Sequence, residues 1–302
     1  MGVSVAEYLG QRTDVDFPVI TPVRTKQPCP FSEGNNCMKS GKKKKPVCSV
    51  RKDDGTYWVV CQNRLCTTKK DIPLCLHQQA ILLDIAKHIF SPTVTADQVF
   101  VKREVQLRVS DLTEYKADYI MTIGDGSSPF PGPDRLILEM QGGGETSGTE
   151  KLTKIVNDWQ RNPRRTNAQL RSMSGASTLE TNAWRRQQEQ FIVKGNIAML
   201  TWKGDGIAFC VGTLLYDYLA RKIDFSSMPD LREHNWTLAL VGIKENENLP
   251  VVPGPVPLAV DETRLLYTNY QTFVHALINQ GLPSPDAFSG DFICLDNTCK
   301  II

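Results

Sequence analysis

Asp118, Glu139 and Gln141 are the residues of this chain whose types and spacing could do chemistry. Asp118 lies in an apolar segment, a Pro/Gly-rich turn follows it, and Glu139 and Gln141 lie at the end of the apolar run that begins at Leu136. A carboxylate at the edge of a buried strand is costly unless a partner compensates its charge, and a metal ion is the usual partner. The spacing therefore indicates a candidate metal site.

The expected strand geometry gives this site a chemical role. Glu139 and Gln141 are two residues apart, so on a strand both side chains leave the same face. Asp118, on a neighbouring antiparallel strand, should reach that face, where two carboxylates and the peptide carbonyl of Met140 can hold Mg²⁺. The ion would activate a water and neutralise the charge that grows on a phosphodiester during in-line attack. The alternative, from spacing alone, is a surface Asp118 and an ion-paired Glu139.

The elements that must position these residues alternate between strand and helix, which predicts an α/β fold without internal repeats. We expect a hairpin at 47–61, a helix over 75–90, strands at 99–109, 117–123, 136–140 and 236–243, and helices at 150–161 and 265–280. Ser177 and Glu180 form a candidate capping box for a further helix that ends near Leu200. The stretch 209–223 fits either a strand followed by a helix or a single helix.

Residues 1–75 differ from the rest of the chain in charge and composition. They carry 13 Lys and Arg against 7 Asp and Glu, whereas residues 76–302 carry 22 against 26. A basic N-terminal unit, with the run Lys42-Lys43-Lys44-Lys45, suggests a polyanionic partner. We therefore divide the chain into a cysteine-rich unit, 1–75, that contacts the polyanion and a main domain, 76–302.

Six of the nine cysteines lie within residues 29–75, and such clustering in a cytosolic protein favours thiolate-metal ligation over disulfides. Cys29, Cys37, Cys48 and Cys61 are separated by seven, ten and twelve residues, and Cys66 or Cys75 could replace one of them. Four sulfur ligands are compatible with zinc, and we expect a closed structural site. The remaining cysteines, at 210, 294 and 299, read as small buried hydrophobic residues.

Both halves of the chain carry motifs that resemble a known nuclease family. An acid, about twenty residues, then acid-x-Lys is the pattern of the PD-(D/E)XK nuclease superfamily, and here Gln141 replaces the lysine. Together with the cysteine-rich unit, this variant resembles the NotI-type restriction endonucleases. The segments that carry the resemblance are Cys29-Pro30-Phe31, Cys37-x-Lys39, Val47-Cys48, Trp58 to Arg64, Asp118 to Gln141, and Asn182 to Arg186 with Gln190 and Lys194.

The resemblance implies a type II restriction endonuclease that cuts double-stranded DNA at a GC-rich palindrome, with a GGCCG-type core such as CGGCCG, and that depends on Mg²⁺. It implies a mixed central sheet flanked by helices, with Asp118 and Glu139 as metal ligands and Gln141 orienting the attacking water. Glutamine is uncharged, so it can position the water only through hydrogen bonds. Glu104 is a candidate third acid.

The resemblance further selects Cys29, Cys37, Cys48 and Cys61 as ligands of a structural iron, with zinc as the other possibility. Cleavage of both strands of a palindrome implies a homodimer. Candidate DNA contacts are basic or amide-bearing residues in three stretches: Lys42, Lys43, Lys44, Arg161, Arg164, Arg165, Asn167, Arg185 and Arg186.

No apolar run is long enough to span a bilayer and no secretory signal is visible, so we expect an intracellular protein, in the bacterial cytoplasm if the resemblance holds. Two other functions stay open. One is a non-catalytic, metal-stabilised protein that binds DNA, and the other is a repair nuclease with an iron-sulfur cluster.

Overall fold

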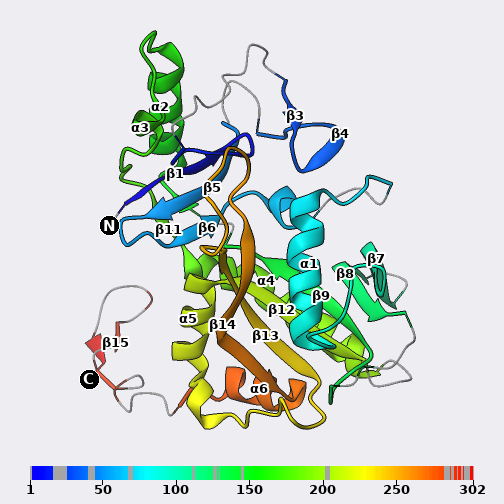
Figure 1. Cartoon of the computed structure of the whole chain (residues 1–302). Helices are drawn as coiled ribbons and strands as arrows, with labels where there is room; N and C mark the ends of the chain where they lie inside the picture. Colours follow the sequence, from blue (N-terminus) through cyan, green and yellow to red (C-terminus); the bar gives the residue numbers. More distant parts are fainter. Residues whose placement is uncertain are drawn as a thin grey trace.

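A computed structural model describes residues 2–15, 26–39, 45–66, 71–110, 113–124, 128, 130–143, 146–200, 205–281, 286, 289–290, 292–293, 295 and 300–301. The helices are α1 (Leu76–Ile89), α2 (Thr149–Arg161), α3 (Asn167–Leu170), α4 (Glu180–Leu200), α5 (Thr213–Ile223) and α6 (Tyr270–Ile278), with short 3₁₀ turns η1 (Gln62–Arg64) and η2 (Phe225–Ser227). The fold is mixed α/β, as the sequence predicted (Figure 1).

The central sheet has six strands in the order β14-β13-β12-β9-β8-β7. Its strands are β7 (Val99–Ser110), β8 (Thr113–Ile123), β9 (Arg135–Gln141), β12 (Gly206–Gly212), β13 (Leu238–Glu245) and β14 (Leu258–Thr268). Strand β12 pairs in parallel with β9 and with β13, whereas the β8–β9, β7–β8 and β13–β14 pairs are antiparallel. The sheet is therefore mixed, with helices on both of its faces (Figure 1).

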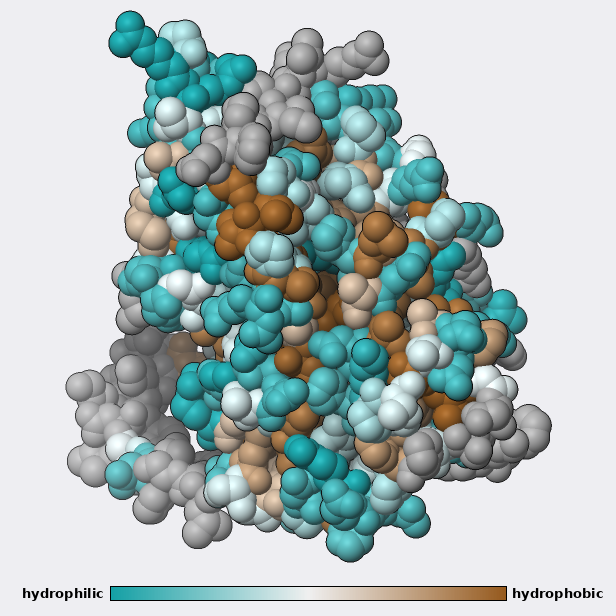
Figure 2. Space-filling view, in the orientation of Figure 1, coloured by the Kyte–Doolittle hydropathy of each residue, from teal (hydrophilic) through white to brown (hydrophobic). Residues whose placement is uncertain are grey.

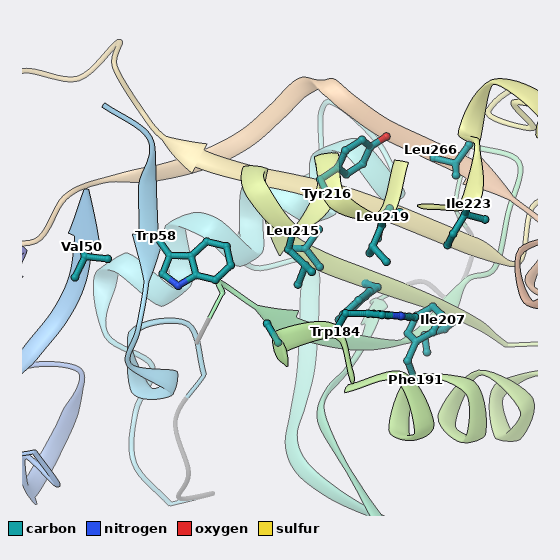
Figure 3. Packing of buried hydrophobic residues seen from close by; sticks show 14 of the residues in the cluster. Val50, Trp58, Trp184, Phe191, Ile207, Leu215, Tyr216, Leu219, Ile223 and Leu266 are labelled. Atoms are coloured by element: carbon teal, nitrogen blue, oxygen red, sulfur yellow. The ribbon is translucent and has the colours of Figure 1, made fainter. Parts of the chain in front are cut away.

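Strand β12 lies at the centre of the core. All seven of its residues are buried, so both faces of the sheet are covered at this strand. Its alternate residues Ile207, Phe209 and Val211 join one apolar cluster, whereas Ala208 and Cys210 join the other. The first cluster contains Trp184 and Phe191 of α4 and Leu215, Leu219 and Ile223 of α5, which are labelled in Figure 3. The second contains the buried face of α1. A strand that is apolar on both faces is typical of the centre of a two-sided sheet.

Four strands from the N-terminal part of the chain build a second sheet in the order β2-β1-β5-β6, of which the sequence predicted only the hairpin at 47–61. Its strands are β1 (Val3–Tyr8), β2 (Gln11–Arg12), β5 (Val47–Lys52) and β6 (Tyr57–Val59), and β3 (Pro28–Cys29) pairs with β4 (Ser32–Asn36) beside it. All six residues of β1 are buried, so this unit contributes its own apolar residues to the core. Both apolar clusters include residues from before and after position 75, and the domain division at 75 stays a prediction.

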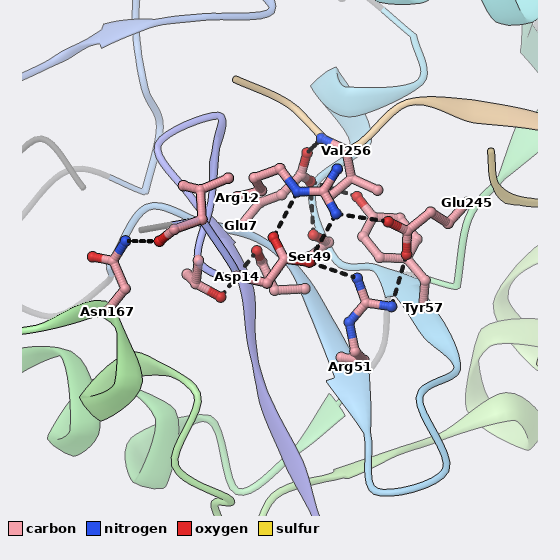
Figure 4. Close-up of polar contacts among 12 residues, drawn as sticks. Glu7, Arg12, Asp14, Ser49, Arg51, Tyr57, Asn167, Glu245 and Val256 are labelled. Carbon is pink, nitrogen blue, oxygen red and sulfur yellow. Dashed lines mark hydrogen bonds and ion pairs between the residues drawn. The ribbon is translucent and has the colours of Figure 1, made fainter. Parts of the chain in front are cut away.

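A buried carboxylate organises this second sheet (Figure 4). Glu7 of β1 accepts hydrogen bonds from Ser49 Oγ at 2.7 Å and from the Tyr57 hydroxyl, and it forms an ion pair with Arg64 at 3.2 Å. The backbone N–H of Val256 donates to the same carboxylate at 2.7 Å. Because Val256 lies in the loop between β13 and β14, Glu7 joins the second sheet to the central one.

Most of the expected elements are confirmed. The hairpin at 47–61, the helix at 75–90, the strand at 136–140 and the helix at 150–161 all form, and 209–223 is a strand followed by a helix. The expected turn between 124 and 133 is only partly within the described residues.

Two local predictions were wrong. Residues 265–268 belong to β14, where Leu265 and Leu266 pair with Val241 and Leu240, so the last helix begins at Tyr270 and ends at Ile278. Ser177 does not cap α4, because it lies in β11 (Ser177–Thr178), which pairs with β10 (Thr146–Ser147). Its hydroxyl contacts the Ser147 hydroxyl at 2.7 Å.

The strands β15 (Phe292–Ile293) and β16 (Lys300–Ile301) pair near the end of the chain. The surface is mostly hydrophilic in the view of Figure 2, with hydrophobic side chains visible in patches between hydrophilic ones. No helix in the described ranges combines the length and the apolar character that crossing a bilayer requires.

Candidate functional site

The predicted acids lie opposite each other on two neighbouring strands. Strands β8 and β9 are antiparallel, with Tyr119 paired to Leu138, so the next pair in this register is Asp118 opposite Glu139. The Asp118 carboxylate accepts a hydrogen bond from the backbone N–H of Met140 at 2.9 Å. The Glu139 carboxylate lies 3.4 Å from the backbone nitrogen of Asp118. The register therefore brings both carboxylates to one place, as the spacing predicted.

Helix α4 covers the face of β9 that carries Glu139 and Gln141. Lys194 Nζ donates to Glu139 Oε2 at 2.7 Å, and Gln187 Nε2 donates to Gln141 Oε1 at 3.0 Å. Both strand residues contact the same helix, which confirms that their side chains leave the same face. The Gln141 amide also donates to the carbonyl oxygen of Gly143 at 2.9 Å.

Glu104 extends the site onto β7. Arg103 and Val105 pair with Tyr119 and Ala117, so Glu104 lies opposite Asp118 in the β7–β8 register. Glu104 is buried and has a φ of 50°, in the left-handed region that residues other than glycine rarely adopt. It forms an ion pair with Lys116. The structure therefore places the candidate third acid beside the first.

Cys66 completes a group of candidate ligands. Its Sγ lies 3.7 Å from Glu104 Oε1 and 3.8 Å from the carbonyl oxygen of Asp118. Within the described part of the chain, Cys66, Glu104 and Asp118 are the one group of at least three ligating side chains whose ligand atoms all lie within 4.8 Å of one another. Glu139 is outside this group and has the Lys194 ammonium as its cationic partner.

Burial changes the acidity of the site. It raises the pKa of Glu139 to about 8, with a further rise from the Asp118 charge that the Lys194 ammonium and its hydrogen bond oppose. Burial also raises the pKa of Asp118, against the hydrogen bond from Met140 N–H and the charge of Lys194. The pKa of the Cys66 thiol is raised by burial and by the Asp118 charge. An added cation would reverse these shifts, because it favours the ionised form of each group.

Two glycines after β9 allow the second sheet to approach the site. A Cβ at Gly143, whose φ is 139°, would meet the Trp58 ring at 2.2 Å, and one at Gly142 would meet Val59 at 2.5 Å. The N–H of Val59 donates to the Gly142 carbonyl at 3.3 Å. Only residues without a side chain fit at these positions, so the Gly142-Gly143 pair brings the end of β6 to the end of β9.

A pocket of about 170 Å³ lies between the end of β6 with the following η1, the end of β9, and α4. Its polar lining comes from Gln62 of η1, Gln141 of β9, and Arg186 and Gln187 of α4. Cys61 also lines it, so the pocket borders both the candidate catalytic strand and the cysteine-rich unit.

The four predicted iron ligands gather in one cluster. Cys29, Cys37, Cys48 and Cys61 are all buried, and they pack around Phe31 with Cys75 at the edge of the cluster. Backbone and side-chain amides point at two of the sulfurs: Gly10 N–H at 3.3 Å from Cys48 Sγ, and Asn63 Nδ2 at 3.8 Å from Cys29 Sγ. Burial raises the pKa of Cys48 and of Cys61.

The cysteine cluster fits a thiophilic metal by its donor set, although no three of its sulfurs, among the described residues, lie within 4.8 Å of one another. Cys66 belongs to a different apolar cluster, beside Glu104. The alternative in which Cys66 replaces one of the four ligands stays a prediction, and the packing of Cys66 beside Glu104 gives it no support.

The residues predicted to contact DNA differ in how exposed they are. Arg161, Arg164, Arg165, Arg185 and Arg186 are exposed, and Arg186 lines the pocket at Gln141. Asn167 is buried and donates to the carbonyl oxygen of Val15 at 3.0 Å, which makes it a poor candidate for contact with DNA. Lys42, Lys43 and Lys44 lie outside the described residues.

Sequence reasoning missed the roles of Lys194, Gln187 and Cys66 at this site. A signal for Lys194 was present, since it follows Gln187 by seven residues, about two helical turns, and so shares its helix face. That face also carries the buried Trp184 and Phe191, which mark it as the face toward the sheet. Cys66 gave no such signal, because its sequence neighbours are the other cysteines.

No protein-family model matches the sequence, and a search of curated proteins finds no significant match. The geometry of the site and the short motifs are therefore the basis of the function proposed below.

Proposed function

We propose that this protein is a type II restriction endonuclease of the PD-(D/E)XK superfamily, similar to the NotI type, which hydrolyses double-stranded DNA at a GC-rich palindrome with Mg²⁺. One observation carries the proposal: Asp118 and Glu139 lie opposite each other on antiparallel strands, with Gln141 on the same face as Glu139. This is the arrangement that the acid, twenty-residue, acid-x-Gln spacing requires.

The residues present fit a hard divalent cation. Asp118 and Glu104 bring carboxylate oxygens together, Glu139 is the next acid in the register, and all three are buried or half-buried. Buried carboxylates with raised pKa values are stabilised by a cation, which in turn prefers oxygen ligands. When bound, Mg²⁺ would supply a water of lowered pKa and neutralise charge on the phosphodiester. Asp118, Glu139 and the Met140 carbonyl are the proposed ligands, with Glu104 as the third acid.

The chain's own residues would orient the reacting groups. Gln141 keeps one amide hydrogen beyond its bond to Gly143, and this hydrogen can hold the attacking water. The water oxygen would form a bond to phosphorus as the bond from phosphorus to the 3′ oxygen breaks. The attacking water would release a proton to solvent, and the leaving 3′ oxygen would take up a proton from solvent, so the step balances. Arg186, at the rim of the same pocket, would contact a phosphate of the DNA backbone.

The cysteine-rich unit would hold DNA-binding loops in place. We propose one structural iron, or zinc, bound by Cys29, Cys37, Cys48 and Cys61, with Lys42 to Lys44 between the second and third ligands in the sequence. Cleavage of both strands would need a homodimer, and the proposed activity belongs in the bacterial cytoplasm.

A non-catalytic DNA-binding protein is the second candidate, and the Lys194–Glu139 ion pair favours it, because a structural ion pair is what a non-catalytic Glu139 would form. The iron-sulfur repair nuclease has no observation in its favour beyond the cysteine cluster.

The variant Asp118→Asn distinguishes the nuclease from the non-catalytic DNA-binding protein. Asparagine keeps an oxygen that can accept the Met140 N–H but loses the charge that would bind the metal. With Mg²⁺ and plasmid DNA, the nuclease reading predicts that the wild type cleaves and that Asp118→Asn is slower by about 100-fold or more, with DNA affinity in Ca²⁺ retained. Cleavage at the wild-type rate by Asp118→Asn would eliminate this site, and an inactive wild type that binds DNA would favour the second candidate.

A further inference from the structure

Lys194 is the most deeply buried charged group on the face of α4 that covers β9. Its side chain is 2% exposed, and its ammonium donates to Glu139 Oε2 at 2.7 Å. A buried ammonium without a partner is costly, so the chain tolerates Lys194 only because Glu139 faces it. Seven residues earlier on the same helix, Gln187 contacts Gln141, so one helix face contacts both polar residues at the end of β9.

The strand itself lacks a cation where the superfamily motif has one. Gln141 is uncharged, its oxygen already accepts from Gln187, and its amide donates to Gly143. It can orient a water but contributes no positive potential.

Two lysines form ion pairs with the acids, Lys116 of β8 and Lys194 of α4. Lys116 pairs with Glu104, but its side chain is 54% exposed, so water screens its charge. Lys194 is enclosed, and its charge acts on both Glu139 and Asp118, where it opposes part of the rise in pKa that burial causes. A charge in a buried site has a larger effect on its neighbours than an exposed one at the same distance.

We propose that Lys194, reaching from α4, supplies at Glu139 the positive charge that the lysine of an acid-x-lysine motif supplies from the strand. Lys194 is then a positioning residue: it fixes the Glu139 carboxylate beside Asp118 and adds positive potential where a phosphodiester would gain negative charge. The inference rests on the proposed nuclease function, because it assigns a role within that site.

Moving the charge tests the inference. Lys194→Met removes the charge with little change in shape, Lys194→Arg keeps the charge, and Lys194→Met combined with Gln141→Lys returns a cation from the strand. Lys194→Gln, which keeps a hydrogen-bond donor to Glu139, replaces Lys194→Met if that variant does not fold. Lys87→Met, at an exposed position on α1, is the matched control.

Two readouts are measured for each variant: the rate of plasmid cleavage in Mg²⁺, and the binding of Mn²⁺ without DNA, followed by the paramagnetic resonance of free Mn²⁺. We expect Lys194→Met to cleave about 10- to 100-fold more slowly, as for other residues that orient a ligand. Lys194→Arg should retain partial activity, and Gln141→Lys should restore most of the loss. Mn²⁺ should bind Lys194→Met at least as tightly as the wild type, because the removed charge repels a cation.

The inference is overturned if the wild type and the Lys194 variant cleave at the same rate while Asp118→Asn is inactive. It is also overturned if Gln141→Lys fails to restore the variant, or if Lys194→Met loses Mn²⁺ binding, since Lys194 would then only support the fold around Glu139. If the wild type cleaves no DNA, the proposed function itself fails, and the inference fails with it.

Discussion

Gln187 of α4 holds the side-chain oxygen of Gln141 at 3.0 Å, while the amide of Gln141 donates to the Gly143 carbonyl at 2.9 Å. The Gln141 side chain is thereby fixed at both ends. One amide hydrogen and one oxygen lone pair remain for a water or a phosphate. This restraint makes Gln141 a preorganised group, because its orientation needs no adjustment when a substrate arrives.

Gln141→Ala should lower the rate of cleavage by about 10- to 100-fold, because it removes the group that orients the water. Gln141→Lys should retain activity, since lysine occupies this position in the common form of the motif. Gln187→Ala should give a smaller loss and should have no further effect when Gln141 is already alanine. The measurement is single-turnover cleavage of a DNA fragment that contains the target. Wild-type rates for Gln141→Ala would mean that the motif consists of the two acids alone.

The raised pKa of Glu139, to about 8, predicts a pH dependence of stability in the absence of added divalent metal. Because the pKa in the folded protein lies above the ordinary value of 4.5, Glu139 stabilises the fold most at low pH, and this contribution is lost as pH rises through about 8. Glu139→Gln, which mimics the protonated form, should flatten the dependence. Thermal melting between pH 5 and pH 9 in metal-free buffer measures it.

Mg²⁺ should reverse this behaviour, because it stabilises the ionised carboxylate. The wild type should then melt at a higher temperature with Mg²⁺ than without it at pH 8, whereas Glu139→Gln should respond less. An equal response of the two proteins to Mg²⁺ would exclude Glu139 as a ligand.

The sequence predicted the strands that carry the acids but not the helix contact that completes the site. The apolar run before Glu139 and the turn after Asp118 are local signals, and they were enough to predict an antiparallel pair. The contact between Lys194 and Glu139 joins residues 55 positions apart in the sequence, and it depends on how α4 is rotated over the sheet. Local periodicity carries no information on which strand residue a helix face will meet.

The errors have similar causes. Leu265 and Leu266 begin an apolar stretch that continues into α6. Because the apolar pattern does not change at the end of β14, the helix was predicted to begin at Leu265, within the strand. The six buried residues of β1 are too few to show a pattern, and their partner strand β5 begins 39 residues after β1 ends. Cys66 was grouped with the other cysteines by sequence proximity, whereas the fold places it beside Glu104.

The cysteine cluster predicts about one equivalent of iron plus zinc per chain in the purified protein, as expected for a closed four-thiolate site. Cys48→Ser should lose the metal and lower the melting temperature, because the metal would link segments that otherwise meet in the small cluster around Phe31. Cys210→Ala, in the central sheet, is the control and should retain the metal. Mononuclear thiolate iron contains no inorganic sulfide, so a sulfide assay separates it from an iron-sulfur cluster. Less than about half an equivalent of metal would contradict the proposed site.

Breaking the Glu7–Arg64 ion pair should destabilise the protein strongly. Burial alone would raise the pKa of Glu7, but the charge of Arg64 and the hydrogen bonds from Tyr57 and Ser49 outweigh it, so the pKa is lowered. Glu7→Ala leaves Arg64 buried without its partner and should cost about 3–5 kcal/mol of unfolding free energy. Because the folded pKa lies below the ordinary value, this stabilisation is present above pH 4.5 and is lost as the pH falls.

Glu114→Gln is the matched control, since the Arg108–Glu114 pair is exposed and should contribute less than about 1 kcal/mol. Denaturant unfolding of both variants at pH 7 makes the comparison. Similar small losses for the two would show that Glu7 does not join the two sheets.

The decisive experiment for the proposed nuclease is digestion of sequenced plasmid DNA, followed by sequencing of the ends. We expect cuts that require Mg²⁺, fall at one GC-rich palindrome on both strands, and disappear in Asp118→Asn. Cleavage that is independent of sequence, cleavage that Asp118→Asn retains, or intact DNA at high enzyme concentration in Mg²⁺ would contradict it.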